Sequence, residues 1–255
     1  MATGIFAPFA ISASALTAEK LRMDVIANNI ANANTSGYKA DRQLFQTYVN
    51  RLAVPGNQVA FVQDRATYFD RSAGQFQTTN NPFDLAIDGD GFLSVRTPQG
   101  PFYSRDGRLH LSPDRTLVDT NSNPLLGEDG QPIQLPDDYT RVRVEGDGTV
   151  SILTANSIDW QDIGRIATYR PVSPETLRKA GNGLVSAPPN GMTLIPAQDT
   201  GSRIMQGTVE ASTVQPVKEI ANMTELSRAY ERLQTLLSDD NDRERTMIQT
   251  LGRTN

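Results

Sequence analysis

Proline and glycine are missing from two long stretches of the chain, and this absence limits the fold more than any other feature. The first stretch lies between Pro8 and Gly37, and the second lies between Pro216 and Gly252. Both residue types interrupt helices, so a long stretch without them favours one continuous helix. The sequence therefore predicts a long helix near each end of the chain.

Apolar residues follow a helical spacing in both stretches. In the first, Leu16, Met23 and Ile30 recur every seven residues. Pro8 suits the first turn of this helix, and Gly37 is expected to close it in a left-handed conformation. In the second stretch, a 3,4,3,4 spacing connects Met223, Leu226, Tyr230, Leu233 and Leu237. Stripes this narrow favour pairing of the two helices and leave surface that other neighbours can cover.

Short strand-like runs separated by turn signals fill the region from about 40 to 212. The turn signals are Asp-Gly and Asn-Gly pairs, as in "RDG" from Arg105 and "GNG" from Gly181. Such pairs between short apolar runs are typical of antiparallel hairpins. The predicted fold class is α+β, with long N- and C-terminal helices paired as a coiled-coil-like layer and a mainly antiparallel β body between them.

These patterns predict three regions. Residues 1–37 and 216–255 would form a terminal helical domain, 38–80 and 200–215 a connecting extended or β region, and 81–199 an outer β domain. Two interpretations of the helical domain stay open at this point. It is either a helical layer packed on the β domain of a monomer, or the part of a subunit that packs against other subunits.

Charge and composition exclude several classes of function. The net charge is -5, so the chain lacks the basic surface that nucleic-acid binding requires. It contains no cysteine and one histidine, His110, which excludes Cys/His catalysis and thiolate metal sites. No basic residue precedes Lys20, so a secretory signal peptide is not expected. No apolar run is long enough to span a membrane.

A calcium-binding loop is the chemical motif that comes closest to a match. In "DLAIDGDG", Asp88 and Asp90 precede Gly91 as at the start of such a loop, but the twelfth position is Gln99 instead of glutamate. Glycine and aspartate in a hairpin turn explain the same letters. His110 alternates with leucines in a predicted strand and is expected to face solvent. We therefore assign no catalytic, cofactor-binding or metal-ligating residues and expect no enzyme.

Four segments carry a resemblance to a known family. They are "DVIANNIANANTSGYKA" (24–40), "NPFDLAIDGDGFLSV" (81–95), "YSRDGRLHLSPDRTLVD" (103–119) and "SRIMQGTVEASTVQPVKEIANMTELSRAYE" (202–231). In this order they resemble the signatures of the flagellar axial proteins, and the chain length is similar to that of the mid-sized members of the flagellar basal-body rod protein family. "RIMQG" followed by "STVQPV" is more similar to the proximal-rod type than to the distal-rod type. Thr213 stands where the family often has asparagine.

The resemblance implies a structural subunit of the proximal rod, in a helical tube that transmits torque from motor to hook. Its implied partners are other rod subunits, further copies of itself and the flagellar type III export apparatus. It would reach the periplasmic part of the basal body without a cleaved signal peptide. Two alternatives stay open: a distal-rod or hook-type axial subunit, and a secreted β-domain cell-wall enzyme. The second stays open because Asp and Glu are plentiful, although no pair of carboxylates stands out.

The asparagine-rich end of the first helix needs a physical explanation, because asparagine is a mediocre helix former. Asn28 and Asn32 lie four residues apart on one face, flanked by Asn29. Their amides could hydrogen-bond across a helix interface and fix its register. The alternative is a frayed helix end with solvated asparagines. The residues expected to pack between subunits are Leu16, Met23, Asn28, Asn29, Ile30, Asn32, Gly37, Met223, Leu226, Tyr230, Leu233 and Leu237.

Overall fold

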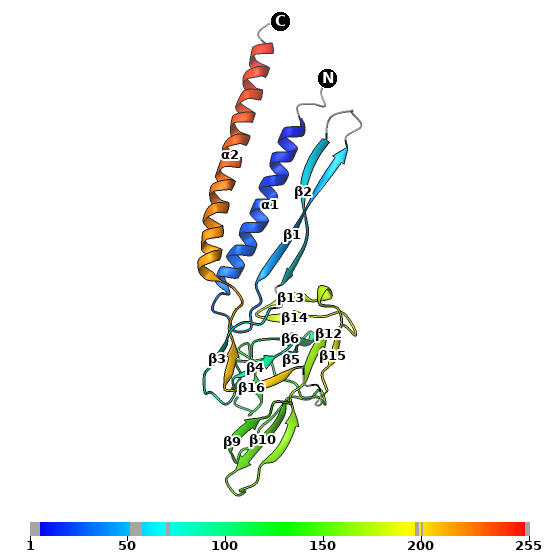
Figure 1. Ribbon diagram of the computed structural model, residues 1–255, viewed down its shortest axis with the longest axis vertical. Coiled ribbons are helices and arrows are strands. Elements are labelled where there is room, and N and C mark those ends of the chain that lie inside the picture. The colour runs from blue at the N-terminus through cyan, green and yellow to red at the C-terminus, as the bar shows by residue number, and fades with distance from the viewer. Residues whose placement is uncertain (1–5, 52–57, 70–71, 197–198, 200, 253–255) are drawn as a thin grey trace. The chain divides into compact units, whose positions relative to one another are not determined.

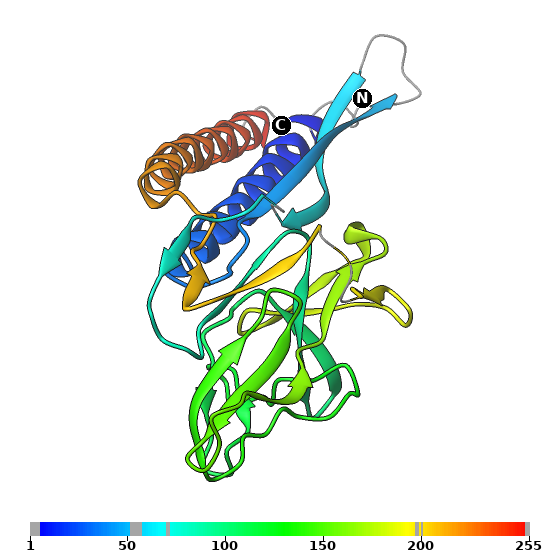
Figure 2. The same cartoon turned by 60° about the horizontal axis from the view of Figure 1, so that its bottom comes forward.

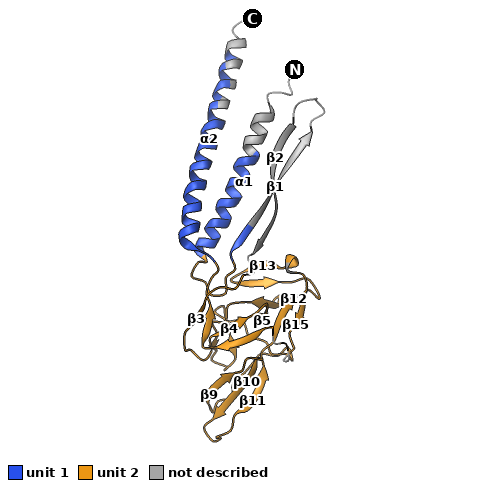
Figure 3. Cartoon of the chain, viewed as in Figure 1, with its two compact units in different colours: residues 1–31, 40–70, 214–255 blue, residues 32–39, 71–213 orange. Residues whose placement is uncertain are grey.

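The computed structural model confirms the α+β class, with two long helices and mainly antiparallel sheets. The chain forms two compact units (Figure 3). Unit 1 comprises residues 1–31, 40–70 and 214–255, and unit 2 comprises residues 32–39 and 71–213. The structure describes residues 6–51, 58–69, 72–196, 199 and 201–252.

Unit 1 combines two helices with one long hairpin (Figure 1). Helix α1 (Phe6–Ala31) contacts helix α2 (Pro216–Gly252) and both strands of the hairpin, β1 (Asp41–Arg51) and β2 (Gln58–Phe69). The strands pair antiparallel, and a bulge follows Leu44. The hairpin is therefore a partner of α1 that the apolar stripes did not predict.

The helix ends agree only in part with the expected turn chemistry. Pro8 is the third residue of α1, where its missing N–H leaves no helical hydrogen bond unmade. Helix α1 ends at Ala31, so the prediction that Gly37 closes this helix is wrong. Gly37 does have a left-handed φ of 65°, but it lies in a turn of unit 2. Pro216 occupies the first position of α2, and Glu219 in the first turn suits the positive end of the helix dipole.

A six-stranded antiparallel sheet is the largest sheet of unit 2. Its strand order is β13-β14-β6-β5-β12-β15 (Figure 1). The central hairpin, β5 and β6, turns at Pro98 and Gln99, and Gly100 begins β6 with a φ of 119° that needs glycine. The strands are β5 (Phe92–Thr97), β6 (Gly100–Ser104), β12 (Thr168–Pro171), β13 (Arg178–Gly181), β14 (Leu184–Ser186) and β15 (Met192–Leu194). A short 3-10 helix, η1 (Pro174–Thr176), precedes β13.

The other strands of unit 2 form one smaller sheet and three ribbons, which Figure 2 shows from a second side. The smaller sheet has the order β11-β10-β9, and each ribbon has two antiparallel strands: β16 with β4, β17 with β3, and β7 with β8. Two ribbons join early strands to late ones, so they connect the start and the end of unit 2. The bounds are β3 (Phe76–Thr78), β4 (Leu85–Asp88), β7 (His110–Leu111), β8 (Leu117–Val118), β9 (Tyr139–Val144), β10 (Thr149–Thr154), β11 (Gln161–Arg165), β16 (Arg203–Gln206) and β17 (Thr208–Glu210).

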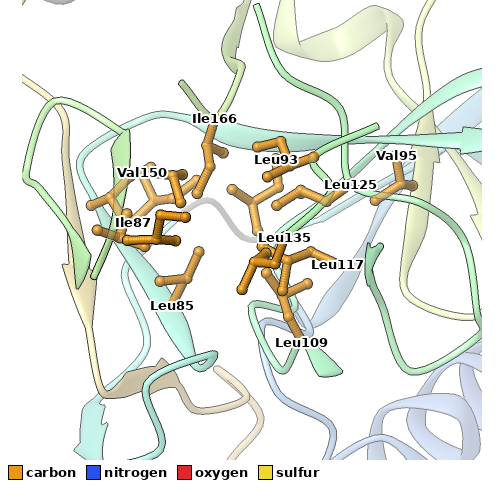
Figure 4. Close-up of a cluster of buried hydrophobic side chains, with 14 of the residues drawn as sticks. Leu85, Ile87, Leu93, Val95, Leu109, Leu117, Leu125, Leu135, Val150 and Ile166 are labelled. Atoms are coloured by element: carbon orange, nitrogen blue, oxygen red, sulfur yellow. The ribbon is translucent and has the colours of Figure 1, made fainter. Parts of the chain in front are cut away.

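Aliphatic side chains from both sheets and the ribbons fill the core of unit 2 (Figure 4). Leu93 of β5 is 1% exposed, Val150 of β10 is fully buried, and Leu125 between strands is fully buried as well. Burying one such side chain stabilises the fold by about 1.5–3 kcal/mol. The core therefore fixes the strands that carry the polar site described next.

Candidate functional site

Glu210, the last residue of β17, carries a buried carboxylate at the centre of a charged cluster in unit 2. Only 1% of its side chain is exposed. Its Oε1 accepts hydrogen bonds from Lys39 Nζ at 2.6 Å and from the Gly74 amide at 2.7 Å. Its Oε2 accepts one from Arg105 Nη1 at 3.3 Å. A buried carboxylate is tolerable only with such partners, so these contacts are a condition of the fold.

The ammonium group of Lys39 connects further parts of unit 2. Besides Glu210, Lys39 Nζ donates to the Ser72 carbonyl at 2.7 Å. The backbone carbonyl of Lys39 accepts a hydrogen bond from Lys179 Nζ of β13 at 2.9 Å. The ammonium group of Lys179 also lies 3.9 Å from the centre of the Tyr38 ring. Lys39 thus links β17, the segment before β3 and the edge strand of the large sheet.

Arg105 follows β6 and completes the cluster. Its guanidinium donates to the carbonyls of Ile87 at 3.1 Å and Gly89 at 2.5 Å, and lies 5.1 Å from the centre of the Phe92 ring. Burial lowers the pKa of Arg105 below its ordinary value, and the nearby carboxylate of Glu210 opposes that shift. Among the described residues, Arg105 Nε is a buried side-chain atom without a hydrogen-bond partner.

The loop of residues 32–39 lies directly against this cluster. Both the Gly37 amide, at 2.7 Å, and Ser36 Oγ, at 3.0 Å, donate to the backbone carbonyl of Glu210. A Cβ on Gly37 would lie 2.2 Å from the carbonyl carbon of Arg105, so no larger residue fits at this point. The "SGYK" segment therefore allows the loop of residues 32–39 to approach Arg105 and Glu210 closely. Gly37 thus packs against residues of its own chain.

A second polar contact fixes the smaller sheet. Gln206 of β16 donates from Nε2 to the Pro82 carbonyl at 2.8 Å and to the Val142 carbonyl at 3.3 Å. Its Oε1 accepts from the Val144 amide at 3.1 Å. One amide side chain thus connects β9 to the β4–β16 ribbon.

In unit 1, the amide side chain of Asn29 likewise joins two segments of backbone. It is 2% exposed, its Nδ2 donates to the Asp41 carbonyl at 3.0 Å, and its Oδ1 accepts from the Asp41 amide at 2.8 Å. This pair of bonds fixes the first residue of β1 on the last full turn of α1. The structure thus gives Asn29 a role inside the subunit, in addition to the packing role expected from the sequence.

The remaining residues singled out in the sequence lie at different depths. Asn28 is exposed, and Asn32 is half-buried and accepts a hydrogen bond from Thr35 Oγ1 at 3.2 Å. Leu226 of α2 is buried. The other apolar residues of the two stripes are half-buried: Leu16, Met23, Ile30, Met223, Tyr230, Leu233 and Leu237. The stripes are therefore covered only in part within unit 1.

The described side chains offer little for bond-making chemistry. They contain no group of three His, Asp or Glu residues placed to hold a metal ion. Asp88 and Asp90 are exposed at a turn, and His110 is exposed in β7. An open groove of about 550 Å³ beside the β7–β8 turn contains Arg115 and Asp137, but these two side chains pair with each other. The site instead has the features of a structural joint.

Known proteins match this chain over nearly its whole length. A rod protein named FlgF from Caulobacter vibrioides is 34% identical over 236 residues, which cover 91% of this chain and 93% of the relative. The FlgF rod protein of Mesorhizobium japonicum is also 34% identical and covers 95% of this chain and 96% of its own length.

The chain belongs to the flagellar basal-body rod protein family. A FlgG rod protein from Borreliella burgdorferi is 31% identical over 86% of this chain and 89% of its own. Three family models match: Flagella basal body rod protein at 9–39, Flagellar hook protein FlgE/F/G D1 domain at 86–152, and Flagellar basal body rod FlgEFG protein C-terminal at 205–250. The expectation of a structural protein instead of an enzyme is thereby confirmed.

The charged cluster brings these three family segments together in one place. Lys39 lies at the end of the first segment, Arg105 lies in the second and Glu210 lies in the third. All three residues lie inside family motifs, but no pattern in the sequence predicts a role for them. Their signal was a charge next to small residues, in "SGYKA", "YSRDG" and "GTVEAS".

No described helix is long and apolar enough to span a membrane.

Proposed function

We propose that this rod-family chain is a subunit of the proximal rod, where copies of it assemble with other rod subunits into a helical tube. The rod would transmit torque from the motor to the hook, and its load would pass through the contacts between subunits. The two FlgF proteins cover 91% and 95% of this chain, whereas the FlgG protein covers 86% of it, which supports the proximal position. Export through the flagellar type III apparatus and a periplasmic location belong to the same proposal.

Exposed apolar residues on α2 carry this proposal. Val217 is 83% exposed, Ile220 is 54% exposed and Leu236 is 59% exposed. A helix with apolar residues on several sides gains stability when neighbours cover them. We propose that α1 and α2 form a coiled-coil-like pair, whose half-covered stripes and exposed apolar residues are buried by neighbouring subunits in the tube.

The asparagines would set the register of that packing. Asn28 of α1 is exposed, and Asn32, which follows the helix and belongs to unit 2, is half-buried. An amide that must find its partner across an interface penalises a slipped register, and a slip in a helical assembly would propagate along it.

An assembly experiment tests the proposal. A bacterium that lacks its own proximal-rod protein is supplied with this chain, and basal bodies are isolated and examined for rods. Val217→Asp together with Ile220→Asp should prevent rod assembly, because it places charges in the proposed interface. Gln99→Asp, at an exposed turn of unit 2, is the matched control and should assemble normally. Normal rods from the double variant would refute the proposed interface.

A distal position is the second candidate, because the FlgG protein of Borreliella burgdorferi shares 31% identity with this chain. The two positions differ in assembly order. If this chain is proximal, its loss should leave basal bodies without any distal-rod protein. If basal bodies without it still contain the complete proximal rod, it belongs to the distal rod.

A further inference from the structure

Two Asn-Gly pairs occur in the sequence, and the structure places them in different environments. Asn182 and Gly183 form the turn between β13 and β14 (Figure 1), and Asn190 and Gly191 precede β15. Both asparagines are exposed and have left-handed backbones, with φ of 52° and 59°. They share the same side chain and the same following residue, so their comparison tests what the fold does to an Asn-Gly pair.

The pair at the β13–β14 turn is open to solvent. Asn182 and Gly183 both have positive φ, 52° and 74°, as a two-residue type I′ hairpin turn requires. A Cβ on Gly183 would meet no atom within 4 Å. The Gly183 amide has no hydrogen-bond acceptor among the described residues. Its nitrogen is thus free to react with the neighbouring side chain.

The second pair is protected at its reacting nitrogen. The Gly191 amide donates to the Pro188 carbonyl at 2.8 Å, which closes a turn around Asn190. Gly191 is buried, and a Cβ on it would lie 2.8 Å from Pro188 Cδ. The nitrogen must break this hydrogen bond and leave the turn before it can react.

We propose that Asn182 is a site of spontaneous deamidation in the folded protein and that Asn190 is protected from it. The Gly183 nitrogen loses its proton to solvent and attacks Cγ of Asn182, which forms a five-membered succinimide ring. The bond between Cγ and the side-chain nitrogen breaks, and that nitrogen leaves as ammonia. Water then opens the ring at either carbonyl and gives aspartate or isoaspartate, so no oxidant or reductant is needed.

The product would disturb a contact that reaches the charged cluster. The Asn182 carbonyl accepts a hydrogen bond from Asn121 Nδ2 at 3.1 Å, and β13 carries Lys179, which donates to the Lys39 carbonyl. Isoaspartate inserts an additional main-chain carbon into a two-residue turn, which shifts the pairing of β13 with β14. Deamidation would therefore loosen the edge strand that holds the loop of residues 32–39.

The test follows both asparagines in the same sample. The purified chain is incubated at mildly alkaline pH, and peptide mapping by mass spectrometry measures the amide-to-acid conversion at each site over time. Asn182 should convert at least about fivefold faster than Asn190 in the folded chain, because one amide hydrogen bond must open at the second site. Equal rates, or faster conversion at Asn190, would overturn the proposal.

Two controls separate the effect of the fold from that of the local sequence. In urea-unfolded chain the two rates should become similar, since both pairs are then ordinary Asn-Gly peptides. A difference that persists unchanged in urea would assign the selectivity to local sequence and refute the role of the fold. The Asn182→Gln variant should lose the conversion at this turn and keep the slow rate at Asn190.

Discussion

Lys39 Nζ lies 2.6 Å from Glu210 Oε1, although 171 positions separate the two residues in the sequence. Both side chains are almost fully buried, at 7% and 1% exposure. A charge in such an environment is costly unless its partner is present. The pair therefore forms only when the segment after α1, which carries Lys39, and the segment before α2, which carries Glu210, have come together in the folded unit 2.

Removing the carboxylate should strongly destabilise unit 2. Glu210→Gln leaves the ammonium of Lys39 and the guanidinium of Arg105 buried without a compensating charge. We expect a loss of about 3–5 kcal/mol in the free energy of unfolding, measured by urea titration. Glu128→Gln is the control, because its pair with Arg165 is more exposed, and it should cost less than about 1 kcal/mol. Equal losses in the two variants would show that the buried cluster contributes no more to the free energy of unfolding than an exposed ion pair does.

Gly37 should tolerate no side chain. Gly37→Ala places a Cβ 2.2 Å from the Arg105 carbonyl carbon and also strains a backbone with φ of 65°. Gly130→Ala adds the same group at φ of 72° where no atom lies within 4 Å, so it should cost only about 1–2 kcal/mol. Thermal unfolding of both variants measures the difference. A Gly37→Ala variant as stable as Gly130→Ala would contradict the observed close approach.

Asn29 should matter for the stability of unit 1. Asn29→Ala removes both hydrogen bonds to the backbone of Asp41 and leaves those groups unsatisfied, at a cost of about 1–3 kcal/mol. Lys20→Ala, at an exposed position of the same helix, should change the free energy of unfolding by less than about 0.5 kcal/mol. Hydrogen exchange of the amides at the start of β1 measures the effect. Unchanged exchange there in Asn29→Ala would mean that the two hydrogen bonds between Asn29 and Asp41 do not stabilise the start of β1.

Protonation of Asp106 should make unit 2 more stable at acid pH. Burial raises the pKa of this carboxyl above its ordinary value, although hydrogen bonds from Arg108 and Thr120 oppose the shift. The folded state therefore holds the proton more tightly than the unfolded state. Its contribution is fully present below the unfolded pKa and is lost as pH rises through the folded pKa.

The Asp106→Asn variant isolates that contribution. Its stability should fall less than that of the natural chain as the pH rises from about 3.5 to about 6, because the titrating group is absent. Urea unfolding at a series of pH values measures the difference. If the two stability curves keep a constant separation, Asp106 is not the group responsible.

The sequence predicted the parts of this fold that depend on local patterns. The long helices follow from the absence of Pro and Gly, and Asn182 and Gly183 do form a hairpin turn because both can adopt positive φ. The strand partners of β3 and β4 were not predicted, since β17 and β16 come from far along the chain. Periodicity carries no information on such pairings, which depend on the whole core.

The polar site was less predictable than the fold. Gly37 was expected at a left-handed position, which is correct, but its role against Arg105 depends on a contact that local helix rules do not describe. Glu210 is one of 29 acidic residues, and only the structure distinguishes its buried carboxylate from the solvated ones. A charge that will be buried has the same letter as one that will be exposed, so the cluster required three-dimensional information.

The most direct test of the central claim is amide hydrogen exchange on the isolated chain and on assembled rods. We predict that amides in residues 14–31 of α1 and 217–239 of α2 exchange faster in the isolated chain than those of β5 and β10, because neighbours have yet to cover their apolar stripes. The same helices should become protected in the rod. Helices that exchange as slowly as the core strands in the isolated chain would contradict the account, because they would need no partner subunit.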